Sequence, residues 1–204
     1  MTEIEAAFDD LEVRDSTKIA VLDIGSNSFH LVVVRVISGT VQILHKLKQK
    51  VRLAEGLSEE GFLSEEAIRR GLDTIKLFEK SISGFDPDSV RIVGTYTLRK
   101  AKNSHKFIKA ARKVISYPVE IISGQEEARL IYQGVAHTHN LQGQTLVIDI
   151  GGGSTEFAIG ANFEPKILRS LDMGCVSYTQ RFFKNGKLTN KAFEQAITAA
   201  QQQL

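Results

Sequence analysis

A short motif that occurs twice constrains the fold of this chain more than any other feature. The segment 23–34 (DIGSNSFHLVVV) aligns with 149–160 (DIGGGSTEFAIG), with Asp, Ile, Gly and Ser at matching positions and apolar residues after them. Each copy joins an apolar strand to a second strand through a turn with Gly and Ser, which is typical of phosphate-binding loops. An internal repeat of this kind predicts two domains that each open with the same strand–loop–strand unit.

Between the two copies, the apolar pattern alternates between strands and helices. Runs rich in β-branched residues predict strands at 19–25, 29–37, 41–47, 90–94 and 119–122, and apolar spacings of three and four predict helices at about 65–80, 104–114 and 125–136. Ser64 is a suitable N-cap for the first helix. A hairpin followed by strand–helix–strand alternation predicts an α/β fold with a mixed sheet and helical crossovers.

The second copy begins in the same way and is shorter. Strands are expected at 146–151, 155–159 and 166–171, followed by a helix at 188–204 that Thr189 or Asn190 caps. No Gly or Pro ends this helix, so we expect the chain to be the N-terminal part of a longer protein. The expected organisation is an acidic flexible leader (1–16), one complete domain (17–140) and the start of a second domain (141–204).

Composition and charge exclude several classes of protein. Hydrophobic residues make up 42% and charged residues 25% of the chain, which is typical of a soluble globular protein. The single cysteine, Cys175, excludes an internal disulfide and favours a reducing compartment, and no apolar run approaches the roughly 18 residues of a membrane span. The acidic N-terminus is the reverse of a secretory signal, so we expect a cytoplasmic protein. A net charge of +2 does not indicate a nucleic-acid partner.

The two repeated turns are candidates for binding phosphate. Glycine lets backbone N–H groups converge on an anion, and Asp23 and Asp149 end their strands where a carboxylate suits a hydrated Mg²⁺ ion. One such loop is better explained as a tight hairpin with a capping serine, whereas two matching loops indicate a phosphate held between two domains. The candidates for phosphate binding in these loops are Gly25, Ser26, Asn27, Ser28, Gly151, Gly152, Gly153, Ser154 and Thr155.

Glu127 is the candidate general base. On a helix that starts near Gln125, the positions three, four, seven and eight residues after Glu127 are all apolar or Gly. A carboxylate on an apolar face needs a reason to be there, and a partly desolvated carboxylate near water and phosphate suits a general base. The alternative is that Glu126 and Glu127 only favour the positive end of the helix dipole.

Basic residues cluster in two segments. The segment 99–113 holds seven Lys or Arg and no acid, and Lys48, Lys50 and Arg52 form a second cluster. An ordinary solvated helix face explains most of the first cluster. Arg99 and Thr97 differ, because they follow a predicted strand at the place where α/β folds hold ligands. Arg99 is therefore a candidate catalytic residue and Thr97 a candidate phosphate ligand, and together the clusters predict a positive track for a long polyanion.

Four other residues carry weaker expectations. His137 and His139 have no third metal ligand nearby, so a polar loop is the better explanation. Cys175 has no His partner nearby and suits a small buried position. His30 is expected on the surface of the sheet.

Four motifs together resemble one known family. DIGSNSFH (23–30), GTYTLR (94–99), SGQEEARL (123–130) and DIGGGSTE (149–156) resemble the exopolyphosphatase / guanosine pentaphosphate phosphatase family, and the resemblance covers roughly 17–204. This family belongs to the actin-like ATPase superfamily, so the resemblance implies two ribonuclease H-like domains with a catalytic cleft between them. It also implies Mg²⁺ as a cofactor, stimulation by a monovalent cation, a homodimer, and peripheral association with the inner face of the membrane.

The resemblance further assigns roles to individual residues. It implies that Glu127 orients or deprotonates the attacking water and that Arg99 neutralises the terminal phosphoryl group. Asp149 and Glu156, together with Asp23, would hold Mg²⁺ or its waters, and the two loops would bind phosphates. The implied reaction is hydrolysis of the terminal phosphoanhydride bond of inorganic polyphosphate, with orthophosphate released processively.

The resemblance leaves the substrate open between inorganic polyphosphate and guanosine pentaphosphate. Gly153 and the segment 162–165 are more similar to exopolyphosphatases, so polyphosphate is the preferred expectation. A sugar- or acetate-kinase-like phosphotransferase would also use paired phosphate loops, and a non-catalytic actin-like nucleotide switch would need no base at Glu127. Residues 1–204 alone are expected to be inactive or weakly active.

Overall fold

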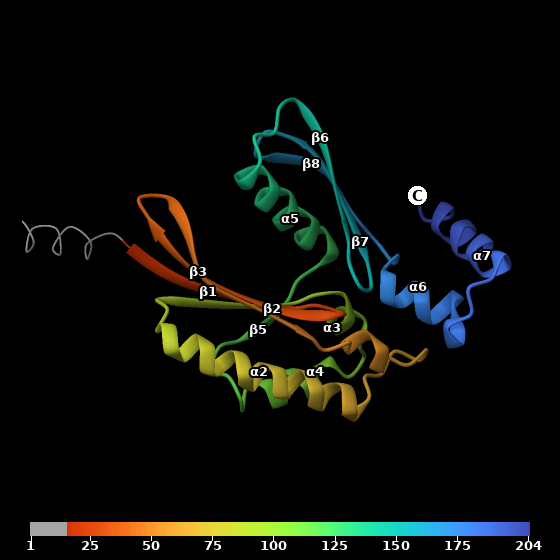
Figure 1. Cartoon of the computed structure of the whole chain (residues 1–204), viewed down its shortest axis with the longest axis horizontal. Coiled ribbons are helices and arrows are strands. Elements are labelled where there is room, and N and C mark those ends of the chain that lie inside the picture. Colours follow the sequence, from red (N-terminus) through yellow and green to blue (C-terminus); the bar gives the residue numbers. More distant parts are fainter. Residues whose placement is uncertain (1–15) are drawn as a thin grey trace, which may run out of the picture.

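The computed structural model describes residues 16–204, which form two β-sheets and the helices that pack on them (Figure 1). Residues 1–15, which make up nearly all of the predicted acidic leader, lie outside the described residues. The first sheet has five strands and the second has three. The predicted α/β class with a mixed sheet is therefore confirmed.

The five-stranded sheet is built around the strand that precedes the first repeated loop. Its order is β3-β2-β1-β4-β5; the β1–β2 and β2–β3 pairs are antiparallel, and the β1–β4 and β4–β5 pairs are parallel. Parallel neighbours need a crossover connection, which the helices after β3 and β4 supply. The strands are β1 (Ser16–Ile24), β2 (Ser28–Ile37), β3 (Thr40–Lys50), β4 (Ser89–Gly94) and β5 (Val119–Ile121).

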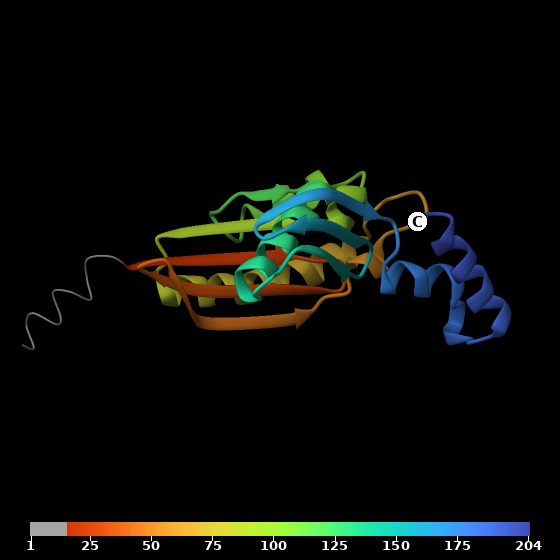
Figure 2. The ribbon, with the colours of Figure 1, turned by 90° about the horizontal axis from the view of Figure 1, so that it is seen from above.

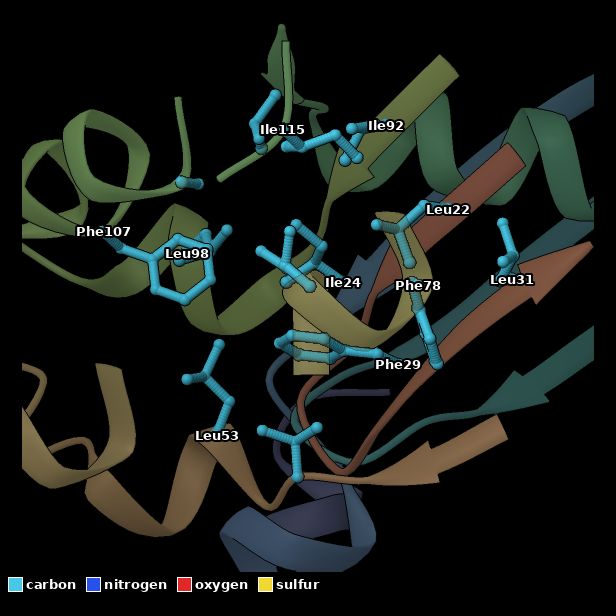
Figure 3. Close-up of a cluster of buried hydrophobic side chains, with 14 of the residues drawn as sticks. Leu22, Ile24, Phe29, Leu31, Leu53, Phe78, Ile92, Leu98, Phe107 and Ile115 are labelled. Atoms are coloured by element: carbon cyan, nitrogen blue, oxygen red, sulfur yellow. The ribbon is translucent and has the colours of Figure 1, made fainter. Parts of the chain in front are cut away.

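Two helices, α2 (Glu65–Phe85) and α4 (Ser104–Ala111), lie on one face of this sheet and bury its core (Figure 1). Ser64 caps α2 as predicted, because its hydroxyl oxygen accepts a hydrogen bond from the Ala67 N–H at 3.2 Å. The core anchors the end of β1 and the start of β2, and so holds the first loop from both sides. Its largest fully buried side chains include Leu22, Ile24, Phe29, Leu31, Phe78 and Phe107 (Figure 3).

The second sheet is antiparallel, in the order β6 (Gln144–Ile150), β7 (Thr155–Ala161) and β8 (Glu164–Leu171). Helix α5 (Gly124–Thr138) packs on it, on the opposite side of the five-stranded sheet from α2 and α4 (Figure 1). Tyr132 is fully buried in this contact, and its hydroxyl donates a hydrogen bond to the Asn162 carbonyl at 3.2 Å.

This packing bears on the predicted division of the chain at residue 140. Helix α5 was grouped with the first domain because it follows β5. Two of its three buried residues, Tyr132 and Ala136, instead cluster with Ala158 of the second sheet. The division into 17–140 and 141–204 stays a prediction, and the packing argues for moving its boundary to the start of α5.

Two short helices near the loops differ from the predicted elements. Helix α3 (Tyr96–Lys100) lies where a loop was expected, because five residues are too few for an apolar repeat. Helix α6 (Cys175–Phe182) is a short helix with no buried residue, and it is absent from the predicted elements. Helix α7 (Asn190–Gln201) is present as expected, and Thr189 caps it. Figure 2 shows α6 and α7 extending beyond one end of the five-stranded sheet.

Candidate active site

A cleft of about 350 Å³ lies where the two repeated loops meet. The loops approach closely, since a Cβ atom on Gly152 would lie 3.0 Å from Ser26 Cβ and 3.1 Å from the Asn27 nitrogen. A larger hollow of about 850 Å³ lies beside α6, but none of the predicted site residues lines it. The cleft is lined by Asp23, Gly25, Ser26, Asn27, Ser28, His30, Lys48, Thr95, Tyr96, Glu127, Asp149, Ile150, Gly151, Gly152, Gly153, Ser154 and Cys175.

Hydrogen bonds from the segment after β3 and from Thr97 fix the first loop, which joins β1 to β2. The Asn27 carbonyl accepts hydrogen bonds from the Val51 N–H at 3.0 Å and the Arg52 N–H at 2.7 Å. The Thr97 hydroxyl donates a hydrogen bond to Ser26 Oγ at 2.8 Å. These bonds fix the loop that joins β1 to β2 in one conformation at the wall of the cleft.

Helix α6 holds the second loop. The Gly151 carbonyl accepts a hydrogen bond from the Cys175 N–H at 3.0 Å, and the Gly152 carbonyl accepts one from the Val176 N–H at 2.8 Å. Gly174, which precedes α6, packs so tightly that a Cβ atom there would lie closer than 3.0 Å to the backbone of Gly152. The first turn of a helix absent from the predicted elements therefore positions the second loop.

Glu127 and Arg99 face each other beside the cleft. Glu127 lies in the first turn of α5, which Ser123 caps by accepting a hydrogen bond from the Glu126 N–H at 3.1 Å. Arg99 on α3 donates from Nη1 to Glu127 Oε2 at 3.0 Å and to the Ile122 carbonyl at 3.0 Å. The Arg99 and Glu127 side chains are only 22% and 15% exposed, so the ion pair is largely shielded from water. Arg99 follows β4 and Glu127 follows β5. The segments after these two neighbouring parallel strands thus bring the predicted catalytic residues together.

Burial raises the pKa of three carboxyl groups in this region. Burial, together with the charge of Glu156, raises the pKa of Glu127 to about 7, although Arg99 opposes the shift. Burial and the charge of Asp149 raise the pKa of Asp23 to about 6. Burial also raises the pKa of Glu156, against hydrogen bonds from two serines that lower it. A carboxyl group whose pKa lies near 7 suits general-base catalysis at neutral pH.

Asp23 and Asp149 fit a divalent cation between the loops. Both line the cleft, and Asp23 Oδ1 is buried with no hydrogen-bond partner among residues 16–204. In the part of the chain that the structure describes, no group of three or more His, Cys, Asp or Glu side chains forms a metal site by itself. Mg²⁺ commonly takes one or two carboxylates and completes its shell with waters and phosphate oxygens, so this pair of side chains suits it.

Glu156 lies beneath the cleft rather than on its wall. It is the cross-strand neighbour of Asp149 and is only 2% exposed. Ser170 on β8 donates a hydrogen bond to Glu156 Oε1 at 2.7 Å. Glu156 is therefore held by β8 rather than exposed to the cleft, and its role as a direct metal ligand stays a prediction.

Three sequence-based expectations need correction. Thr97 and Thr155 are buried and do not line the cleft; the Thr97 hydroxyl donates to Ser26 and the Thr155 hydroxyl to the Met173 carbonyl. Because both hydroxyls are used inside the protein, these threonines support the loops rather than contact the cleft. Cys175 was expected to be buried, but it is exposed and lines the cleft, because the first turn of α6 faces the second loop.

Lys48, which belongs to the predicted positive track, lines the cleft, and so do five residues that the sequence did not assign to the site: His30, Thr95, Tyr96, Ile150 and Cys175. His30 lies directly opposite Asp23 across the β1–β2 pair, and Lys48 lies opposite His30 across the β2–β3 pair. Directly opposed residues point to the same face of a sheet, so assigning a register to the predicted strands would have found both. Burial and the charge of Lys48 lower the pKa of His30. Tyr96 on α3 packs against Gly153 at the far wall.

For the phosphate release that the four sequence motifs imply, replacing Arg99 by Gln is expected to lower kcat about a thousandfold, since a cation on the transferring phosphoryl group has effects of that order. The change also removes the charge that opposes the raised pKa of Glu127, so the midpoint of the pH–rate profile should rise above about 7. Lys109→Ala, which removes an exposed cation from α4, is the control and should alter neither. An unchanged midpoint in Arg99→Gln would contradict the coupling.

The fold and the site define a class of protein. The mixed α/β fold, with its five-stranded mixed sheet and the two Asp-Ile-Gly loops at one cleft, matches that of Ppx/GppA proteins of the actin-like ATPase class. The crystal structure of an exopolyphosphatase from Cytophaga hutchinsonii is similar with a TM-score of 0.87 and 31% identity, over 92% of this chain and 60% of that one. The Aquifex aeolicus PPX-GPPA enzyme is similar with a TM-score of 0.76 and 30% identity, over 93% of this chain and 63% of that one.

This chain belongs to the Ppx/GppA phosphatase family, whose model matches residues 32–204. The family expected from the four motifs is therefore confirmed. A putative exopolyphosphatase of Haemophilus influenzae is 50% identical over 183 residues, which cover 90% of this chain and 57% of that protein. A guanosine-5'-triphosphate,3'-diphosphate pyrophosphatase of Vibrio cholerae is 51% identical over 185 residues, which cover 91% of this chain and 37% of that protein. The chain thus spans between 37% and 57% of the length of these two curated relatives.

Proposed function

We propose that the protein hydrolyses the terminal phosphoanhydride bond of inorganic polyphosphate and releases orthophosphate. The observation that carries this proposal is the shielded Glu127–Arg99 pair beside a cleft walled by two phosphate-loop motifs. Phosphoryl transfer depends on positioning and charge neutralisation more than on covalent chemistry. A base, a fixed cation and two converging loops are the groups that such a reaction requires.

In the proposed reaction, Glu127 accepts a proton from a water molecule whose oxygen attacks the terminal phosphorus. The bond between that phosphorus and the bridging oxygen breaks, and the shortened chain leaves with the bridging oxygen and its negative charge. Arg99 balances the charge on the terminal phosphoryl group, while the two loops bind the other phosphate oxygens. Mg²⁺ held by Asp23 and Asp149, with Glu156 behind them, would add positive charge at the phosphate oxygens.

Guanosine pentaphosphate, which also ends in a phosphoanhydride, is the second candidate substrate. Relatives named as an exopolyphosphatase and as a guanosine pyrophosphatase are 50% and 51% identical to this chain, so overall identity favours neither. We keep polyphosphate first, with processive release, because Gly153 and the segment 162–165 are more similar to exopolyphosphatases.

Orthophosphate release from both substrates, each with and without Mg²⁺, tests this proposal. Because the chain spans only part of the length of its relatives, the longest natural gene product that contains it is assayed beside residues 1–204. We expect a higher kcat/KM with polyphosphate, loss of release when a chelator removes Mg²⁺, and little release by residues 1–204 alone. Release from guanosine pentaphosphate alone would reassign the substrate, and no release from either would overturn the proposal.

We also propose several properties of the whole protein. They are a cytoplasmic location with peripheral membrane association, a homodimer, stimulation by a monovalent cation, and no nucleic-acid partner. Across residues 16–204, no helix combines the length and apolar character that a membrane crossing needs. Sedimentation of the gene product, with and without vesicles, measures the dimer and the membrane association.

A further inference from the structure

A row of three polar side chains crosses the five-stranded sheet at the cleft. Asp23 on β1, His30 on β2 and Lys48 on β3 are directly opposed in the register, and all three line the cleft. Opposed residues of antiparallel strands share one face of the sheet. Strand β3 is an edge strand, so the row leads from the candidate Mg²⁺ carboxylates to an open side of the sheet.

The middle and outer members of this row lack protein partners for their polar groups. His30 Nε2 is buried and has no hydrogen-bond partner among the described residues. Buried polar atoms in proteins are nearly always hydrogen-bonded, so an orphaned ring nitrogen at a cleft suggests a ligand or a water. Lys48 and Lys50 are exposed, and no carboxylate of residues 16–204 forms an ion pair with either.

A second hollow adjoins the cleft. This hollow, of about 490 Å³, shares Asn27 and Cys175 with the cleft, so the two lie side by side. Lys50 and Arg52 line it, and the one carboxylate among its lining residues, Glu55, lies 3.4 Å from Arg52. Lys48 and Lys50 alternate with Gln49 along β3 and therefore point to the same face.

We propose that His30, Lys48, Lys50 and Arg52 form an anion track that binds the part of the substrate beyond the scissile bond. His30 and Lys48 bind the phosphates next to the reacting one, and Lys50 with Arg52 binds phosphates further along a long chain. This inference rests on the proposed function, because it takes the terminal phosphoryl group to lie in the cleft beside Glu127. Lys106 and Lys109 of the other basic cluster do not belong to this track, since they lie on α4 at the opposite face of the sheet.

The track predicts that the effect of each lysine depends on the length of the substrate. Lys48→Ala should raise KM about tenfold for tripolyphosphate and for long-chain polyphosphate alike, since both reach it. Lys50→Ala should raise KM about tenfold for the long chain and leave KM for tripolyphosphate nearly unchanged. Both variants should keep kcat close to the wild-type value, because neither lysine contacts the reacting atoms. The control Lys106→Ala/Lys109→Ala removes two exposed cations from α4 and should change neither KM.

Equal effects of Lys50→Ala on both substrates, or none on the long chain, would overturn the track. Failure of the proposed function gives a different result, namely no orthophosphate from either substrate with the wild-type protein. In that event, titration of fluorophore-labelled long-chain polyphosphate into the wild-type protein and Lys50→Ala still decides the inference. About tenfold weaker binding by Lys50→Ala supports the track, and equal binding overturns it.

Discussion

Glu127→Gln is expected to lower kcat for orthophosphate release about a thousandfold, within the range measured when a general base is removed. The amide keeps the size of the side chain and loses the carboxylate that accepts the proton of the attacking water. The ion pair of 3.0 Å with Arg99 is lost, but Arg99 keeps its hydrogen bond to the Ile122 carbonyl. The geometry of the site should therefore persist, and the loss should appear in kcat rather than in KM.

Glu126→Gln is the matched control, because it makes the same chemical change one position along the same helix. Glu126 forms an ion pair with Arg129 at 2.7 Å, and its side chain is 32% exposed. Because Glu126 does not line the cleft, this change should alter activity by less than about twofold, and the lost ion pair should lower stability by no more than about 1 kcal/mol. If Glu127→Gln released orthophosphate at the wild-type rate, the proposed mechanism would be wrong. The actin-like nucleotide switch, which needs no base at this position, would then remain.

The raised pKa of Glu127 also predicts how the wild-type protein responds to pH. Only the deprotonated carboxylate accepts a proton, so the rate should rise with pH through about 7. Between pH 4.5 and about 7, the folded protein holds a proton on Glu127 that the unfolded chain has lost, so stability falls as pH rises through this window. In urea titrations, Glu127→Gln should match the wild-type protein near pH 4.5 and be the more stable of the two above pH 7. An equal stability difference at both pH values would contradict the assignment.

Gly174→Ala is expected to destabilise the protein by about 1–3 kcal/mol, the usual effect of overpacking a tight contact. A Cβ atom at this position would lie closer than 3.0 Å to backbone atoms of Gly152 and Gly153, which cannot move aside as a flexible side chain would. The second phosphate loop must shift, and a shift of about 1 Å at a catalytic site typically lowers the rate about a hundredfold. Urea denaturation and orthophosphate release measure the two effects.

Gly134→Ala makes the same substitution where space is open. Gly134 lies on the exposed side of α5, and a Cβ atom there would have nothing within 4 Å. Alanine is the better helix former, so this variant should gain about 0.5–1 kcal/mol and keep full activity. If Gly174→Ala kept the stability and activity of Gly134→Ala, the close packing of α6 on the second loop would be needed for neither.

Most of the fold follows from local patterns in the sequence. Strand β1 and the capped helix α2 appear as predicted, because apolar runs, spacings of three and four, and capping residues act over a few neighbouring positions. The repeat also indicated that the two Asp-Ile-Gly loops would meet, and they form one cleft. Helices α3 and α6 have too few residues or too little burial to leave such a pattern, so they were missed.

The structure places Glu127 at the cleft, where the sequence analysis expects it, and its role as the general base stays a prediction; part of the reasoning that led to it did not hold. The buried stripe of α5 is Ala128, Tyr132 and Ala136, one position along from the stripe inferred from the sequence. Glu127 is desolvated instead because the first turn of α5 lies at the cleft. There Glu127 contacts Arg99, which lies 28 positions earlier in the chain. A local period cannot report a contact over that distance in the chain.

The sequence by itself determined the chemical groups that this protein carries: two Asp-Ile-Gly loops, the carboxyl groups of Asp23, Glu127 and Asp149, and Arg99. Only the tertiary structure decided which of these groups reach the cleft and which stay behind it. It buried the Thr97 hydroxyl against the first loop and aligned His30 and Lys48 across the sheet. Burial and register depend on partners far apart in the chain, and they set the distances, the pKa values and the path open to a substrate.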